Sequence, residues 1–149
     1  MLIPAGNVFP MFKISSPQDI SFYDEHQKLI KKNGFVWFCR FGKTKISLKT
    51  NEGLKIFFVK ESASHRDKNK KYLLQFTEIS TEPVTSGYPA YYNSVDKKAI
   101  LWMKVTSIIE LQQDFENYFQ SASSDVPLQK IYRSMCTSFF IKAKADLTI

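Results

Sequence analysis

The residues best suited to binding chemistry gather in the segment 80–98, STEPVTSGYPAYYNSVDKK. It contains Tyr88, Tyr91 and Tyr92, followed by Asn93 and Ser94. A tyrosine ring can stack on the face of a nucleobase, while amide and hydroxyl groups hydrogen-bond to its edge. Tyrosines at this spacing also pack back on a sheet to fix a loop, and we expect at least one to do so. We favour a base pocket over packing alone.

A second group lies in the apolar run FVWFCRF, residues 35–41, which has the length of one strand. Alternation places Phe35, Trp37, Cys39 and Phe41 on one face and Val36, Phe38 and Arg40 on the other. Arg40 is either a charge at the strand end that reaches solvent or a buried cation that needs an anionic or carbonyl partner. We add Trp37, Phe38 and Arg40 to the expected base pocket.

Positive charge is concentrated in the first half of the chain. The 149 residues contain 21 Lys and Arg against 14 Asp and Glu, with a pI near 9.4. Residues 1–71 hold fourteen of the basic and six of the acidic side chains, most densely from Arg40 to Lys71. Such a sector favours a nucleic-acid partner over a surface that is basic only for solubility. The expected phosphate contacts are Lys43, Lys45, Arg66, Lys68, Lys70 and Lys71.

Other classes of function find little support in the sequence. Two cysteines, Cys39 and Cys136, are too few for a disulfide framework, and with His26 and His65 they lack the spacing of a zinc site. A phosphate-binding loop at Gly42–Thr44 would need a glycine where Trp37 stands. We therefore expect no cofactor, no metal and no catalytic residue. No apolar run approaches a membrane span and nothing marks export, so we expect a soluble, cytoplasmic protein.

Apolar periodicity predicts the elements that must position these residues. Residues 1–14 show no period and predict a loose arm. A helix is expected over 15–33, capped by Ser15 or Ser16 and closed at Gly34, with Ile20, Tyr23, Gln27 and Ile30 on its apolar stripe. Strands are expected at 35–41, 53–60, 72–79, 98–109 and 139–145, shorter helices at 111–120 and 127–135, and exposed loops at 61–71 and 80–98.

This order predicts an α+β fold: a small, curved, mostly antiparallel sheet or barrel of about five or six strands with flanking helices. We expect two parts. Residues 1–33 form an arm and helix packed on the domain, and residues 34–149 form the domain itself.

The order of motifs resembles a known family. The segments that carry the likeness are FVWFCRFGK, EGLKIFFVK, EISTEP, the Tyr88-Pro89 loop, the strand around Trp102 and the Pro127-Leu128 helix. Together they are similar to an EVE-type domain of the PUA-like group, which also includes YTH and ASCH domains. The likeness covers roughly residues 34–145. The Asp that follows Gly in the family's second strand is replaced here by Leu54.

The resemblance implies a PUA-like fold and a reader that flips one base, often methylated cytosine or adenine, into an aromatic pocket. Such domains also serve as the specificity module of modification-dependent (Mcr-type) restriction systems, beside a motor or nuclease that this chain lacks. The leading hypothesis is a non-enzymatic DNA reader. The alternative is an ASCH-like RNA-binding domain with ribonuclease activity that uses Lys104, Tyr92 or Glu78. A third hypothesis is a protein-interaction domain whose aromatic loop contacts a partner.

Overall fold

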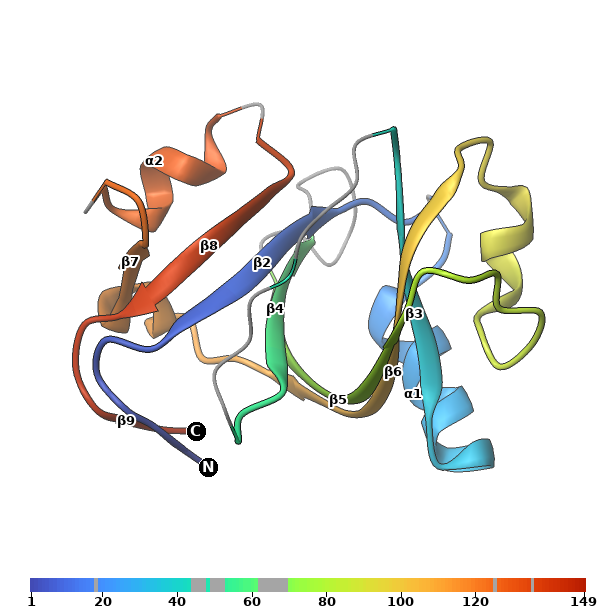
Figure 1. The fold of residues 1–149 in the computed structure, drawn as a ribbon, viewed down its shortest axis with the longest axis horizontal. Helices are drawn as coiled ribbons and strands as arrows, with labels where there is room; N and C mark the ends of the chain where they lie inside the picture. Colours follow the sequence, from blue (N-terminus) through green and yellow to red (C-terminus); the bar gives the residue numbers. More distant parts are fainter. Residues whose placement is uncertain (18, 44–47, 49–52, 62–69, 125, 135) are drawn as a thin grey trace. The chain divides into compact units, whose positions relative to one another are not determined.

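The computed structural model describes residues 1–149 except 18, 44–47, 49–52, 62–69, 125 and 135 (Figure 1). In chain order its elements are β1 (Leu2–Ile3), β2 (Val8–Ile14), α1 (Phe22–Asn33), β3 (Val36–Phe41), β4 (Ile56–Glu61), β5 (Lys71–Ser80), the 3-10 helix η1 (Ala90–Ser94), β6 (Ala99–Glu110), the 3-10 helix η2 (Phe115–Tyr118), β7 (Phe119–Ser121), α2 (Leu128–Tyr132), β8 (Ser138–Ala143) and β9 (Leu147–Thr148). Within the described part, no helix is long and apolar enough to cross a membrane.

The strands confirm the α+β class and correct its detail. Seven described strands form one mixed sheet in the order β3-β6-β5-β4-β2-β8-β7, and β1 pairs with β9 in a separate two-stranded sheet. β2 and β4 are parallel, whereas β2–β8, β3–β6 and β7–β8 are antiparallel. β3 and β7 lie at the two ends of this order, so the sheet does not close into a barrel. The barrel alternative is wrong, and the sheet has more strands than expected.

The chain forms two compact units. Unit 1 contains residues 1–15, 49–73 and 110–149, and unit 2 contains residues 16–48 and 74–109. Each unit is therefore assembled from separate stretches of the sequence. The expected boundary between residues 33 and 34 falls inside unit 2.

In unit 1 the first residues are not a loose arm. β2 lies between β4 and β8 in the sheet, with Met11 opposite Phe58 on one side and Phe139 on the other. Four consecutive residues of β2 are buried, so side chains on both of its faces are covered and the strand shows an apolar run instead of alternation. Phe9 and Phe12 are fully buried, and the ring of Phe9 meets the ring of Phe58 edge-on at 5.9 Å.

Residues 111–120, where we expected a helix, form the 3-10 helix η2 and the start of strand β7 instead. The apolar spacing that predicts a helix here instead places two phenylalanines against the ring of Phe58. Phe115 stacks on Phe58 with ring centroids 5.9 Å apart, and Phe119 meets the same ring at 5.2 Å. The expected helix at 127–135 is present as the shorter α2.

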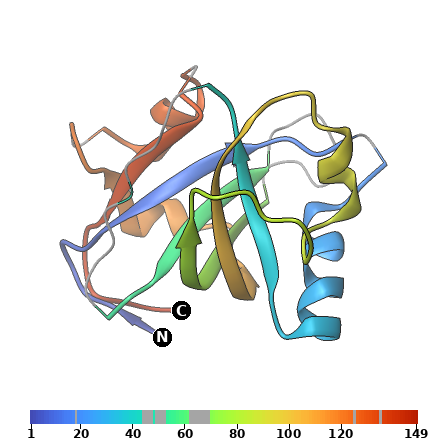
Figure 2. The ribbon, with the colours of Figure 1, turned by 45° about the vertical axis from the view of Figure 1, so that its right-hand side comes forward.

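In unit 2, α1 lies beside β3 (Figure 2) and begins later than expected. Ser21, not Ser15 or Ser16, is its N-cap and accepts a hydrogen bond from the Asp24 backbone N–H. The C-terminal expectation is confirmed, because Gly34 adopts φ +83° and its N–H donates to Ile30 O. The buried stripe contains Phe22 and His26 instead of Tyr23 and Gln27.

Candidate functional site

The loop that follows β5 covers the free edge of β3. The backbone N–H of Trp37 donates to Gly87 O at 2.8 Å, and the N–H of Cys39 donates to Tyr92 Oη at 3.4 Å. A strand at the end of a sheet otherwise presents a row of unpaired backbone groups. The loop therefore replaces a neighbouring strand, and this position brings its tyrosines against β3.

Gly87 allows the close approach of loop and strand. Its φ is +81°, a left-handed conformation that L side chains rarely adopt. A Cβ built there would lie 3.1 Å from the ring of Phe35 and 3.2 Å from that of Trp37. The site thus needs glycine at this position both for its backbone angle and for the space it leaves.

Tyr92 is anchored in the interior of unit 2. Nδ1 of His26 lies 2.8 Å from Phe22 O, which only accepts, so Nδ1 carries the hydrogen. Burial lowers the pKa of His26 to about 3, although the bond to Phe22 O opposes this shift. The ring is therefore neutral, and its Nε2 accepts from the Tyr92 hydroxyl at 2.6 Å. One of the three tyrosines thus packs inward as expected.

Two further tyrosines lean on this anchor and remain partly exposed. The ring of Tyr88 stacks on Tyr92 with centroids 5.9 Å apart and an interplanar angle of 12°, and it contacts Trp102 at 5.4 Å. Tyr91 meets Tyr92 edge-on at 5.0 Å, and Trp37 packs against the same cluster. We call Trp37, Tyr88 and Tyr91 the aromatic surface, since all three are half-buried above a core of Cys39, Tyr92 and Trp102.

The remaining expected pocket residues divide into two groups. Asn93 borders the aromatic surface, because its Oδ1 accepts a hydrogen bond from the Tyr88 hydroxyl at 3.0 Å. Ser94 is exposed at the end of η1. Phe38 is buried on the other face of β3, where its ring meets those of Phe22 and His26. Arg40 is half-buried, and burial lowers its pKa.

Lys104 is a cation beside the aromatic surface that our expected binding set did not contain. It is the antiparallel register partner of Trp37, so the two side chains share one face of the β3–β6 pair. Its Nζ lies 4.5 Å from the centroid of the Phe35 ring, within cation–π distance. The sequence names Lys104 only for the ribonuclease alternative, because its place beside Trp37 depends on the β3–β6 register, which is not readable from one sequence. Lys43 is exposed immediately after β3.

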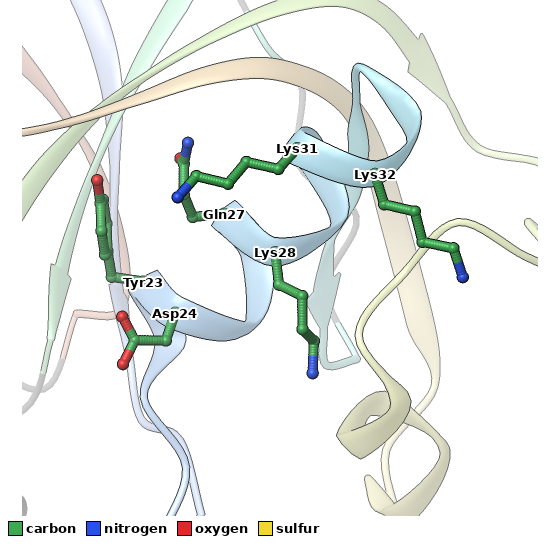
Figure 3. A pocket seen from close by; sticks show the side chains of 6 residues that line it. All are labelled: Tyr23, Asp24, Gln27, Lys28, Lys31 and Lys32. Carbon is green, nitrogen blue, oxygen red and sulfur yellow. The ribbon is translucent and has the colours of Figure 1, made fainter.

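The outer face of α1 adds a second group of cations in unit 2. Figure 3 shows the side chains that line a surface hollow of about 620 Å³: Tyr23, Asp24, Gln27, Lys28, Lys31 and Lys32. The three lysines are exposed, and Lys28 pairs with Glu25 at 3.0 Å. With three lysines and one aspartate in its lining, the hollow carries a net positive charge.

The other expected phosphate contacts lie outside unit 2 or outside the described residues. Lys70 forms an exposed ion pair with Glu110 at 3.3 Å, and Lys71 pairs with Glu116 at 2.6 Å, both in unit 1. Lys45, Arg66 and Lys68 fall in segments that the structure does not describe.

The geometry gives little support to acid–base or nucleophilic chemistry at these residues. Burial raises the pKa of Tyr92 well above its ordinary value and raises that of Cys39 to about 12. Lys104 contacts the Phe35 ring, and Glu78 is exposed on β5. Across the described residues, no three His, Cys, Asp or Glu side chains come together as metal ligands. The described side chains instead present half-buried aromatic rings with one cation beside them.

Known proteins add no assignment to this geometry. No family model, curated protein or solved structure matches the chain.

Proposed function

We propose that this protein is a non-enzymatic nucleic-acid-binding module that stacks one nucleobase on its aromatic surface. The observation that carries the proposal is the stack of Tyr88 on Tyr92, with Trp102 in tilted contact beneath it and Tyr88 itself partly exposed. An aromatic ring fixed from beneath is a preorganised platform, so a base that stacks on it orders little protein.

The tyrosine hydroxyls and Asn93 add polar groups at the rim of this platform. The Tyr88 hydroxyl donates to Asn93 Oδ1, which leaves the amide N–H₂ of Asn93 as a donor at an exposed position. A base on the Tyr88 ring would meet this donor at its edge. The platform therefore combines a sequence-tolerant contact with one that selects for an acceptor on the base.

Cations on the same unit supply contacts for the phosphate backbone. Lys104 lies beside Trp37, Lys43 follows β3, and Lys31 and Lys32 are exposed on α1. Backbone contacts of this kind give affinity that falls steeply with salt and is independent of sequence. Specificity would then come from the stacked base.

A modified base in DNA is the ligand class that we favour, on the resemblance to EVE-type domains. Extruding a base from a duplex costs a few kcal/mol, and stacking recovers about 1–3 kcal/mol per aromatic contact. The two free energies are close in size. The burial of one methyl group contributes about 0.8 kcal/mol and can therefore decide whether the base stays flipped.

The test is a fluorescence-anisotropy titration with matched duplexes that carry cytosine, 5-methylcytosine, 5-hydroxymethylcytosine or N6-methyladenine at one position. We expect one modified duplex to bind about four-fold more tightly than the unmodified one, the ratio that corresponds to about 0.8 kcal/mol, with a preference that persists as salt is raised. Equal affinity for all duplexes and for single-stranded RNA would exclude a base reader. Absence of any salt-dependent binding would favour the protein-interaction alternative.

A further inference from the structure

Three lysines of unit 1 lie side by side on adjacent strands. Lys13 on β2 is the register partner of Lys60 on β4, in the parallel β2–β4 pair. β5 borders β4 on its other side, and the Glu61 N–H donates to Lys70 O, which places Lys71 beside Lys60. Figure 1 shows the end of β4 meeting β2, where the two strands pair. Like charges opposite each other in a sheet destabilise it.

The lysine ammonium groups converge on one side chain of α2. Nζ of Lys60 lies 5.0 Å from the centroid of the Tyr132 ring, and Nζ of Lys71 lies 5.9 Å from it. Nζ of Lys13 donates to the backbone oxygens of Tyr132 at 3.4 Å and Ser134 at 2.7 Å. The three cations therefore surround a small region at the end of α2.

One carboxylate enters this group. Glu116 pairs with Lys71 at 2.6 Å and accepts from the Tyr132 hydroxyl at 3.4 Å. The side chains of Lys71 and Glu116 are only 14% and 7% exposed, so this pair is weakly screened by solvent. Glu61 follows Lys60 in the strand, so its side chain leaves the opposite face. Glu116 thus pairs with Lys71 and also acts on Lys60.

Lys60 bears most of the resulting electrostatic cost. It is 8% exposed, and desolvation lowers its pKa, with further lowering by the charges of Lys71 and Lys13 and an opposing effect of Glu116. Lys13 and Tyr132 are only partly buried, so the group reaches the surface. An anion that enters here would offset repulsion between lysines that the folded protein otherwise retains.

We propose that Lys13, Lys60 and Lys71 form a binding site for a phosphate group, next to Tyr132 and Glu116. A phosphate accepts several charge-assisted hydrogen bonds, and its negative charge would offset the repulsion that Lys71 and Lys13 exert on Lys60. The Tyr132 hydroxyl has a single hydrogen, which it donates to Glu116, so the lysines supply the donors to the phosphate. The phosphate is either free or part of a nucleic-acid backbone.

The experiment follows the melting temperature of the full chain while inorganic phosphate replaces NaCl at constant ionic strength. We expect a saturable rise with phosphate that NaCl alone does not give. Lys60→Met, which keeps most of the aliphatic stem, should abolish the rise. Lys144→Met, at an exposed position of the same unit, should leave it unchanged. Glu116→Gln removes the competing carboxylate and should tighten phosphate binding several-fold.

A second arm replaces phosphate by a short oligonucleotide and measures its affinity. A phosphate response in the first arm identifies free phosphate as a sufficient ligand. Loss of oligonucleotide affinity in Lys60→Met, without a phosphate response, identifies a backbone phosphate. Equal responses to phosphate and NaCl, together with unchanged oligonucleotide affinity in Lys60→Met, would overturn the site. The site is independent of the proposed base reader, so Tyr88→Ala should not alter the phosphate titration.

Discussion

The hydroxyl of Tyr92 donates a hydrogen bond to Nε2 of His26 across 2.6 Å in the interior of unit 2. The same hydroxyl oxygen accepts from the backbone N–H of Cys39. A single phenol group therefore links helix α1, strand β3 and the loop that carries the other two tyrosines. In this account Tyr92 positions the aromatic surface, whereas Tyr88 and Tyr91 contact the ligand.

The first prediction concerns the anchor itself. Tyr92→Phe keeps the ring but leaves His26 Nε2 and the Cys39 N–H without their partner, and a buried unsatisfied group costs about 1–3 kcal/mol. We expect urea unfolding curves to show that Tyr92→Phe lowers the free energy of unfolding by about 2 kcal/mol. Tyr88→Phe, which removes only an exposed hydrogen bond to Asn93, should cost about 0.5 kcal/mol or less. Equal losses in the two variants would contradict the anchoring role.

The second prediction is a pH dependence of stability. The pKa of His26 is lowered from 6.5 to about 3 in the folded protein, so the unfolded chain binds the proton first as pH falls. The contribution of neutral His26 to the free energy of unfolding is therefore present above pH 6.5. It declines as the pH falls below this value, by about 2 kcal/mol between pH 7 and pH 5. His26→Gln should flatten this slope in urea unfolding curves. An unchanged slope in the variant would show that another group is responsible.

The third prediction tests the contact between loop and strand. Gly87→Ala and Gly34→Ala both place a side chain at positive φ, but only at position 87 does the new Cβ meet other rings. We expect Gly34→Ala to cost about 1 kcal/mol from backbone strain alone. Gly87→Ala should cost at least about 1 kcal/mol more and weaken nucleic-acid binding. Thermal melting of the two variants measures the difference, and identical costs would show that the loop adapts freely.

The fourth prediction uses the two tryptophans as reporters. Trp37 is partly exposed in the aromatic surface, whereas Trp102 is 7% exposed beneath it. Because a stacked base quenches indole emission, Trp102→Phe, with Trp37 as its one tryptophan, should lose fluorescence on titration with DNA. Trp37→Phe, with Trp102 remaining, should change little. Quenching of the buried residue alone would place the ligand elsewhere.

The sequence predicts well those features that depend on local chemistry. The Gly34 cap, the strand around residues 36–41 and the face shared by Trp37 and Cys39 follow from turn chemistry and alternation. Ser21 is an equally good cap three residues before Asp24, but Pro17 drew the expected start of the helix toward Ser15 and Ser16. Two acceptable caps in one segment cannot be separated without knowing which turn packs.

The structural features that the sequence does not predict depend on partners far away along the chain. β2 contains Pro10, which lacks a backbone donor and argues against an interior strand, yet Pro10 lies opposite Phe140 in the β2–β8 pair. His26 resembles an exposed helix residue until Tyr92, 66 positions away, supplies its hydrogen bond. The sequence likewise places Lys71 in a basic sector, whereas Glu116 pairs with it from across unit 1.

The most direct test of the base platform compares Tyr88→Ala with Tyr88→Phe in anisotropy titrations against matched modified and unmodified duplexes. We predict that Tyr88→Phe, which keeps the ring stacked on Tyr92, retains the preference for the modified duplex. Tyr88→Ala should lose most of that preference, because it removes about 1–3 kcal/mol of the stacking that holds the extruded base, while its salt-dependent binding to unmodified DNA persists. An undiminished preference in a folded Tyr88→Ala protein would contradict the platform.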